Sequence, residues 1–247
     1  MSFSAAAIPT ADSWFQTPIQ SIPARTVGSF SATADGACEA HLADGSVVYV
    51  KPRPGAAHNL LVAREKIAFD LAYLLKLPVA PVVVRRPEPA SGWHHYSVLS
   101  LACLASGRLW GAGGGAHIDL AAPALEALRV FWTWIGDSDH NGHGQNLLYE
   151  IRTGMCAVVA IDHSYSLCHG NLADPLTVGV SAGYGTAGRP DCQHALRRTV
   201  TQILSLDPAR IERLVRRLAE ILTDAEQERI LRILDERRAS LRRLLGL

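Results

Sequence analysis

Hydrophobic and polar residues alternate in short runs between residues 24 and 50. Asp35-Gly36 and Asp44-Gly45 interrupt this alternation, and an Asp-Gly pair between alternating segments is typical of a β-hairpin. The pattern predicts a meander of three strands, over residues 25–31, 37–42 and 46–50. Lys51 follows the third strand directly, and we expect Pro52 to break the pairing there.

The apolar positions then change to helical spacing, and residues 59–76 are predicted to form a helix. One face of this helix carries Leu61, Ala68, Ala72 and Leu75. Glu65 falls on the same face, and a buried carboxylate needs a cationic partner because burying an unpaired charge is costly. Lys66 points away from that face, so Lys51 is the predicted partner.

Beyond this helix the pattern alternates between apolar segments and glycine- or proline-rich ones. We expect strands over 79–84 and 96–104 and a helix over 123–135. Trp132 and Trp134 in that helix are predicted to lie in the core. Residues 1–22 show no clear period and are predicted to be extended. The run Gly111–His117 has no strand before it and no Lys-Ser/Thr after it, so it predicts a flexible linker and not a phosphate-binding loop.

The midsection of the chain reads FWTWIGDSDHNGHGQNLLYEIRTGMCAVVAIDHSYSL. It predicts a polar loop, a strand over 146–149, a turn at Thr153-Gly154, and a strand over 157–161 that stops at Asp162. This arrangement brings oxygen-bearing side chains to one point, and oxygen ligands suit Mg²⁺, which in turn suits phosphates. Residues 167–190 are predicted to be loop. Three helices are expected to follow, over 192–204, 208–222 and 225–245.

Strands and one helix therefore precede a mostly helical part with an inserted hairpin. For a chain of 247 residues, 48% of them hydrophobic, this order predicts a two-lobed α+β fold with a β-rich N-lobe over 1–104 and a helical C-lobe over 105–247. No apolar run reaches the roughly 18 residues of a membrane helix, so we expect a soluble, cytoplasmic protein without a membrane partner.

Net charge and cysteine content argue against some classes of function. The net charge is +1 with no concentrated basic block, and direct nucleic-acid binding is therefore not expected. The five cysteines are widely spaced and contain no C-x-x-C pair, which is typical of reduced structural thiols. The sequence has only three lysines but many arginines, so a lysine at the end of a strand, as Lys51 is, becomes a candidate for a chemical role.

A strand lysine, a glutamate on the next helix, an acidic loop ending in Asn and an Asp after a hairpin occur here in that order. Protein kinases use those parts in the same order, although the HRD and DFG sequences are absent. More closely, the passages VVYVKPRP, NLLVAREKIAFDLAYLLKLPVAPVVV and DHNGHGQNLLY…VVAIDHSYSL resemble HipA-like kinases and, more distantly, type II phosphatidylinositol 4-kinases. The resemblance covers roughly residues 20–170, and the helical tail matches only in kind.

The resemblance implies a protein-kinase-like fold and phosphoryl transfer from ATP with Mg²⁺. Lys51 would hold the α- and β-phosphates, and Glu65 would position Lys51. Asp139 would accept the proton from the attacking hydroxyl or orient it, while Asn146 and Asp162 would hold Mg²⁺. The first hairpin, GSFSATADG, is similar to the loop that covers the phosphates in this family. It would contribute Gly28, Ser29, Ser31 and Gly36.

One departure from the family concerns the loop between the base and the metal ligand. The usual spacing is five residues, whereas Asn146 follows Asp139 by seven. Either the loop holds two extra residues, or Asn141 occupies the Asp position and the base is lost. We favour Asp139 because Gly142 and Gly144 allow a longer loop, and Asp137 is a possible substitute for the base.

The leading hypothesis is an ATP- and Mg²⁺-dependent kinase that phosphorylates a Ser/Thr hydroxyl on a protein. The first alternative is a nucleotide-binding pseudokinase that acts through a partner, in keeping with the seven-residue spacing. The second is a metal-dependent hydrolase, since His140, His143 and His163 beside aspartates could bind Zn²⁺ or Mn²⁺.

Overall fold

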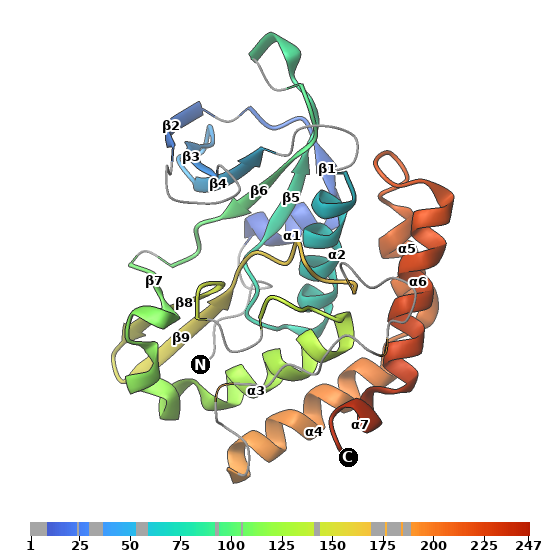
Figure 1. Cartoon of the computed structure of the whole chain (residues 1–247). Helices are drawn as coiled ribbons and strands as arrows, with labels where there is room; N and C mark the ends of the chain where they lie inside the picture. The colour runs from blue at the N-terminus through green and yellow to red at the C-terminus, as the bar shows by residue number, and fades with distance from the viewer. Residues whose placement is uncertain are drawn as a thin grey trace.

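A computed structural model describes residues 9–23, 25–29, 37–52, 59–91, 94–104, 106–140, 144–168, 176, 184 and 189–247. These residues form a mixed α+β structure with two sheets and a group of helices that includes the C-terminal end of the chain (Figure 1). No helix in this part of the chain combines the length and the hydropathy that crossing a lipid bilayer requires.

The larger sheet has six strands and contains the predicted meander. Its spatial order is β1 (Ile19–Gln20), β5 (Val82–Arg85), β6 (Ser97–Leu101), β4 (Val47–Pro52), β3 (Cys38–His41) and β2 (Arg25–Ser29). Lys51 lies opposite Val98, and Pro52 lies opposite Ser97, so β4 does not stop before Pro52 as predicted. Proline lacks the N–H of a ladder bond, but at the end of a strand this donor is not needed.

The N-terminal segment also differs from the prediction of an extended lead-in. Helix α1 (Pro9–Gln16) precedes β1, which pairs in parallel with β5. Ala11 and Trp14 on this helix are buried. Burial of these side chains is a tertiary interaction, and it stabilises a short helix whose sequence alone has little helical periodicity.

The smaller sheet contains the predicted hairpin. Its strands are β7 (Arg108–Leu109), β8 (Leu147–Arg152) and β9 (Met155–Ala160). Positive φ at both Thr153 and Gly154 gives the turn the mirror-image twist that two-residue hairpins require. Ala160 at the end of β9 bonds to the chain ahead of β5. Its N–H donates to the Pro78 carbonyl at 2.8 Å, and its carbonyl accepts from the Ala80 N–H at 2.9 Å. The hairpin is thereby fixed beside the larger sheet.

The remaining elements are mostly helical. They are α2 (Asn59–Leu75), η3 (Pro89–Ser91), η4 (Trp110–Ala112), η5 (Gly114–His117), α3 (Ile118–Ile135), α4 (Pro190–Ser205), α5 (Pro208–Arg216), α6 (Asp224–Ala239) and α7 (Leu241–Leu244). Helix α3 begins at Ile118, five residues before its predicted start, so Pro123 lies inside the helix and not at its beginning. The boundary between the two predicted lobes stays a prediction.

The glycine run is not the flexible linker that its composition predicted. It forms the short helices η4 and η5, and the Gly111 N–H donates to the Gly144 carbonyl at 3.1 Å. A Cβ on Gly144 would lie 2.3 Å from the Gly111 nitrogen. The two backbones approach so closely because Gly144 has no side chain at the contact.

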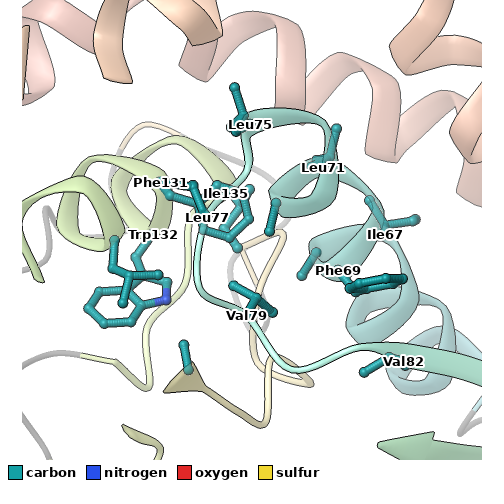
Figure 2. Packing of buried hydrophobic residues seen from close by; sticks show 14 of the residues in the cluster. Ile67, Phe69, Leu71, Leu75, Leu77, Val79, Val82, Phe131, Trp132 and Ile135 are labelled. Atoms are coloured by element: carbon teal, nitrogen blue, oxygen red, sulfur yellow. The ribbon is translucent and has the colours of Figure 1, made fainter. Parts of the chain in front are cut away.

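One hydrophobic core connects α2 with the end of α3. Figure 2 shows Phe131, Trp132 and Ile135 of α3 lying near Leu77 and Val79, which follow α2. Trp132 and Trp134 are fully buried, which confirms their prediction as core residues. Helix α2 is buried on nearly every side, so Lys66 is also buried, at 0% exposure, although it lies off the face that carries Glu65. Helical spacing cannot reveal burial on several faces when neighbours cover them all.

Candidate active site

Lys51 lies between two carboxylates at the junction of β4, α2 and the chain after β9. Its Nζ donates to Glu65 Oε1 at 3.0 Å and lies 2.8 Å from Asp162 Oδ1. The Lys51 side chain is 10% exposed, and that of Glu65 is 2% exposed. Burial by itself would lower the pKa of Lys51, but the Glu65 and Asp162 carboxylates outweigh it and the pKa is raised. The ammonium is therefore held in its charged form.

Asp162 reaches this position because of its backbone conformation. It follows the last residues of β9 with φ at +58°, a left-handed conformation that aspartate adopts more readily than most residues. Its Oδ1 also accepts a hydrogen bond from the Ser164 hydroxyl at 2.8 Å. The main-chain bonds of Ala160 fix the strand end, so Asp162 turns toward Lys51 at the point where the hairpin meets the larger sheet.

Asp139 and Asn146, which are seven residues apart in the acidic loop, lie in contact. The Asn146 side-chain amide donates through Nδ2 to Asp139 Oδ2 at 2.5 Å. This hydrogen bond does not use the side-chain oxygen Oδ1, which can act as a ligand. The Asn146 main-chain carbonyl accepts from the Ile161 N–H at 3.0 Å, next to Asp162 in the chain. Backbone pairing therefore brings Asn146 alongside the start of the Asp162 turn.

The acidic loop begins where α3 ends. Gly136 has φ at +60° and stops the helix in the usual left-handed cap, and the Asp137 N–H bonds to the Trp132 carbonyl. A Cβ on Gly136 would lie 2.5 Å from Cys168 Sγ. The loop can leave the helix in this direction because the cap residue is glycine.

Asp137 and His140, near the start of the acidic loop, form an ion pair. Asp137 Oδ1 lies 2.9 Å from His140 Nδ1, and both side chains are completely buried. Burial opposes the charge on each group. Because the partner's charge outweighs burial in each case, the pKa of Asp137 is lowered and that of His140 is raised. The His163 ring stacks against the His140 ring, with centroids 4.5 Å apart.

The structure brings some of the predicted site residues together and does not describe others. Lys51, Glu65 and Asp162 meet at one point, and Asp139 contacts Asn146. Gly28 and Ser29 form the end of β2, where a register shift between Thr26 and Gly28 interrupts pairing with β3. Ser31 and Gly36 lie outside the described residues, as do Asn141 and His143. Their expected roles stay predictions.

Sequence reasoning did not find the Asp137–His140 pair as a structural unit. It assigned both residues only to alternatives, one as a substitute base and the other as a metal ligand. The available signal was the helix-ending Gly136, which places the next residues at the C-terminus of a buried helix. No linear pattern gives the contact of His140 with the chain after β9.

The comparisons with known proteins give structural likeness only. No family model matches the chain, and no curated protein matches its sequence. The chain is similar to HipA in the toxin–antitoxin complex of Shewanella oneidensis MR-1 with HipB and operator DNA, with a TM-score of 0.43 and 12% identity over 90% of this chain and 64% of that one. It is also similar to WaaP in complex with acyl carrier protein, with a TM-score of 0.38 and 15% identity over 96% of this chain and 91% of that one.

The chain thus spans less than two thirds of the HipA chain that it matches. At these TM-scores and identities the likeness assigns no residue and no activity. Any assignment of function has to rest on the side chains that the fold brings together.

Proposed function

We propose that this protein is an ATP- and Mg²⁺-dependent phosphotransferase whose acceptor is a Ser/Thr hydroxyl on a protein. The observation that carries the proposal is the position of Lys51, whose ammonium contacts Glu65 and Asp162 at once. A buried lysine fixed by one carboxylate and next to a second is suited to bind nucleotide phosphates beside a metal ion.

The charges of the site favour a divalent cation with a phosphate. Lys51 supplies one positive charge, whereas Glu65, Asp139 and Asp162 are acidic. Carboxylate and amide oxygens are the ligands that Mg²⁺ prefers, and the donor set of Asp162 and Asn146 fits this ion. When bound, Mg²⁺ would neutralise charge on the transferring phosphoryl group.

The chain's own residues would divide the remaining work. Lys51 would hold the phosphates, and Glu65 would keep its ammonium aimed at them. Asp139 would orient the acceptor hydroxyl and take its proton, with the Asn146 amide holding the carboxylate in place. Phosphoryl transfer depends mainly on positioning and on neutralising charge, so these few groups are sufficient.

The contact between Asp139 and Asn146 bears on the choice of base. A loop two residues longer than usual could have separated them, yet their side chains are hydrogen-bonded. Asp137 is a poor substitute, because its side chain is completely buried and its Oδ1 already accepts from His140 and from two backbone N–H groups. Both points favour Asp139 as the base.

The test is transfer from labelled ATP, with a mixture of cellular proteins and the chain itself as acceptors. We expect transfer by wild type, and a loss of at least a hundredfold in Asp139→Asn, Asp162→Asn and Lys51→Met. Asp235→Asn and Lys76→Met, which change exposed residues of the same types, serve as matched controls. Wild type that neither binds Mg-ATP nor transfers phosphate would refute the proposal.

A separate outcome would support the pseudokinase alternative. In that case ATP would raise the melting temperature of wild type, and Lys51→Met would abolish the shift, but no labelled phosphate would appear on any acceptor. The nucleotide site would then stand without the transfer reaction.

A further inference from the structure

The His140 ring has an acceptor at each of its two nitrogens. Nδ1 lies 2.9 Å from Asp137 Oδ1, and Nε2 lies 2.9 Å from the Ile161 main-chain carbonyl oxygen. A carbonyl oxygen has no proton to donate, so the Nε2 contact requires a proton on Nε2. The Nδ1 contact requires a second proton if the Asp137 carboxyl is ionised.

The surroundings of Asp137 favour the ionised form. Besides facing His140, its Oδ1 accepts from the backbone N–H of Asp139 at 3.0 Å and from that of His140 at 3.1 Å. These donors stabilise the carboxylate, and a proton on Oδ2 would have no acceptor, because Oδ2 is buried and has no hydrogen-bond partner among the described residues. The pKa of Asp137 is lowered accordingly.

His163, which lies beside His140, is neutral. The Trp132 indole N–H donates to His163 Nε2 at 3.2 Å, and an indole nitrogen can only donate. His163 Nε2 therefore keeps its lone pair. Burial, together with the neighbouring His140 charge, lowers the pKa of His163 to about 3, so the ring is neutral with its proton on Nδ1.

These hydrogen bonds also decide whether the cluster can hold a metal ion. Asp137, His140 and His163 place ligand-type atoms within 4.8 Å of one another. A ligating imidazole nitrogen needs a free lone pair, but His140 donates from both nitrogens and the lone pair of His163 Nε2 is occupied by Trp132. The three residues form an ion pair stacked on a neutral ring, and the arrangement does not suit a metal.

The His140 contact connects two parts of the site that are distant in the chain. His140 follows Asp139 directly, and Ile161 directly precedes Asp162. The Trp132 and His163 rings both stack against the His140 ring, with centroids 4.6 and 4.5 Å away, so the His140 ring has little freedom to turn.

We propose that His140 is a positioning residue, held as an imidazolium by Asp137, that fixes the loop carrying Asp139 to the main chain ahead of Asp162. This role rests on the proposed function, in which Asp139 and Asp162 act on the same phosphoryl group. Asp137 then serves as the counter-anion of His140 and takes no part as a base.

The first experiment measures protonation and does not depend on activity. Nitrogen-15 NMR of the histidine side chains in the full chain at pH 8 should show both His140 nitrogens protonated, although an unperturbed histidine, with a pKa of about 6.5, would be neutral there. His163 should be neutral with its proton on Nδ1. A neutral His140 ring in wild type would overturn the proposal.

The second experiment uses Asp137→Asn, an isosteric change that removes only the charge. His140 should become neutral and lose one ring N–H signal, while kcat for phosphate transfer falls at least tenfold and KM for ATP changes less than threefold. Ser138→Ala, at the exposed neighbouring position, is the matched control. Unchanged kcat in Asp137→Asn with a neutral His140 would also overturn the positioning role.

The two proposals fail in different ways. Wild type that shows a doubly protonated His140 but no transfer would refute the phosphotransferase and leave the ion pair supported. Transfer by a wild-type protein whose His140 is neutral would support the phosphotransferase and refute the positioning role of His140. If Asp137→Asn does not fold, the wild-type spectrum alone still decides the charge of His140.

Discussion

Glu65 Oε1 lies 3.0 Å from Lys51 Nζ, although Lys51 belongs to β4, Glu65 belongs to α2, and the two residues are 14 positions apart in the chain. The Glu65 side chain is almost completely buried, and its charge is matched by that of Lys51. This pairing offsets the cost of the buried carboxylate and holds the Lys51 ammonium beside it, and both effects can be measured.

Replacing Glu65 by Gln should weaken both stability and nucleotide binding. The amide can still accept a hydrogen bond but no longer offsets the buried charge, so we expect the free energy of unfolding to fall by about 1–3 kcal/mol. Affinity for Mg-ATP should fall roughly tenfold, which corresponds to about 1.4 kcal/mol. Urea unfolding and calorimetric titration measure the two effects. Glu228→Gln, at an exposed site, should change neither, and equal behaviour of the two variants would contradict the assignment.

Replacing Gly144 by Ala should displace the loop that leads to Asn146. The new Cβ would lie 2.3 Å from the Gly111 nitrogen, and backbone cannot move aside as a flexible side chain can. We expect a loss of about 1–3 kcal/mol in stability, as for other overpacked sites, together with a fall in Mg²⁺ affinity. Gly115→Ala is the matched control, because nothing lies within 4 Å of its Cβ position. A Gly144→Ala protein with wild-type metal affinity would show that this contact does not position Asn146.

Replacing Asp70 by Ala should be among the most destabilising single changes. Asp70 pairs with Lys66 inside α2 and accepts from Arg217 at 3.2 Å, and both Asp70 and Lys66 are fully buried. Removing the carboxylate leaves buried positive charge without its partner, which costs about 3–5 kcal/mol. Chemical denaturation measures the loss.

The double variant Lys66→Met, Asp70→Leu provides the comparison for this prediction. Apolar side chains of similar size can replace a buried ion pair at little cost, so it should be more stable than Asp70→Ala. If the single variant lost less than about 1 kcal/mol, the pair would have to be more exposed to solvent than the structure shows.

Lys66 should also give the protein a distinctive dependence on alkaline pH. Burial, aided by the Arg217 charge, lowers the pKa of Lys66 to about 8 despite the Asp70 carboxylate, whereas in the unfolded chain it is about 10.4. Between these values the unfolded chain binds one proton more than the folded protein, so stability rises with pH across this window. Below about pH 8 both states carry the proton and the contribution is constant.

Comparison with Lys66→Met isolates this effect from other titrating groups. The stability of wild type minus that of the variant, from urea unfolding at a series of pH values, should increase from about pH 8 toward about pH 10. Parallel curves for the two proteins would mean that the pKa of Lys66 is not lowered by burial.

Local patterns predicted the elements that carry the site. The Asp44-Gly45 turn and the alternating residues before Lys51 indicated the strand, and Thr153-Gly154 indicated the hairpin that ends near Asp162. The pairing of Lys51 with Glu65 followed from a physical rule, since an acid on a buried helix face needs a cation. These features depend on neighbours in the sequence or on one missing charge, and both can be read without coordinates.

Other features depended on contacts that no local pattern contains. Helix α1 is stabilised by the burial of Ala11 and Trp14. Lys66 is buried because α2 is covered from several sides, whereas helical periodicity indicates only one buried face. The close approach of Gly111 to Gly144 made the glycine run part of the site's support, although its composition predicted a linker.

The sequence by itself determined that Lys51 lies at the end of a strand, that Asp162 follows a hairpin and that Glu65 needs a cationic partner, because strand ends, turns and unpaired charges follow from local chemistry. The tertiary structure alone decided the roles of Asp137, His140 and His163. A histidine has the same sequence signature whether it accepts or donates, and its hydrogen-bond partners, here the Asp137 carboxylate and the Ile161 carbonyl, come from packing.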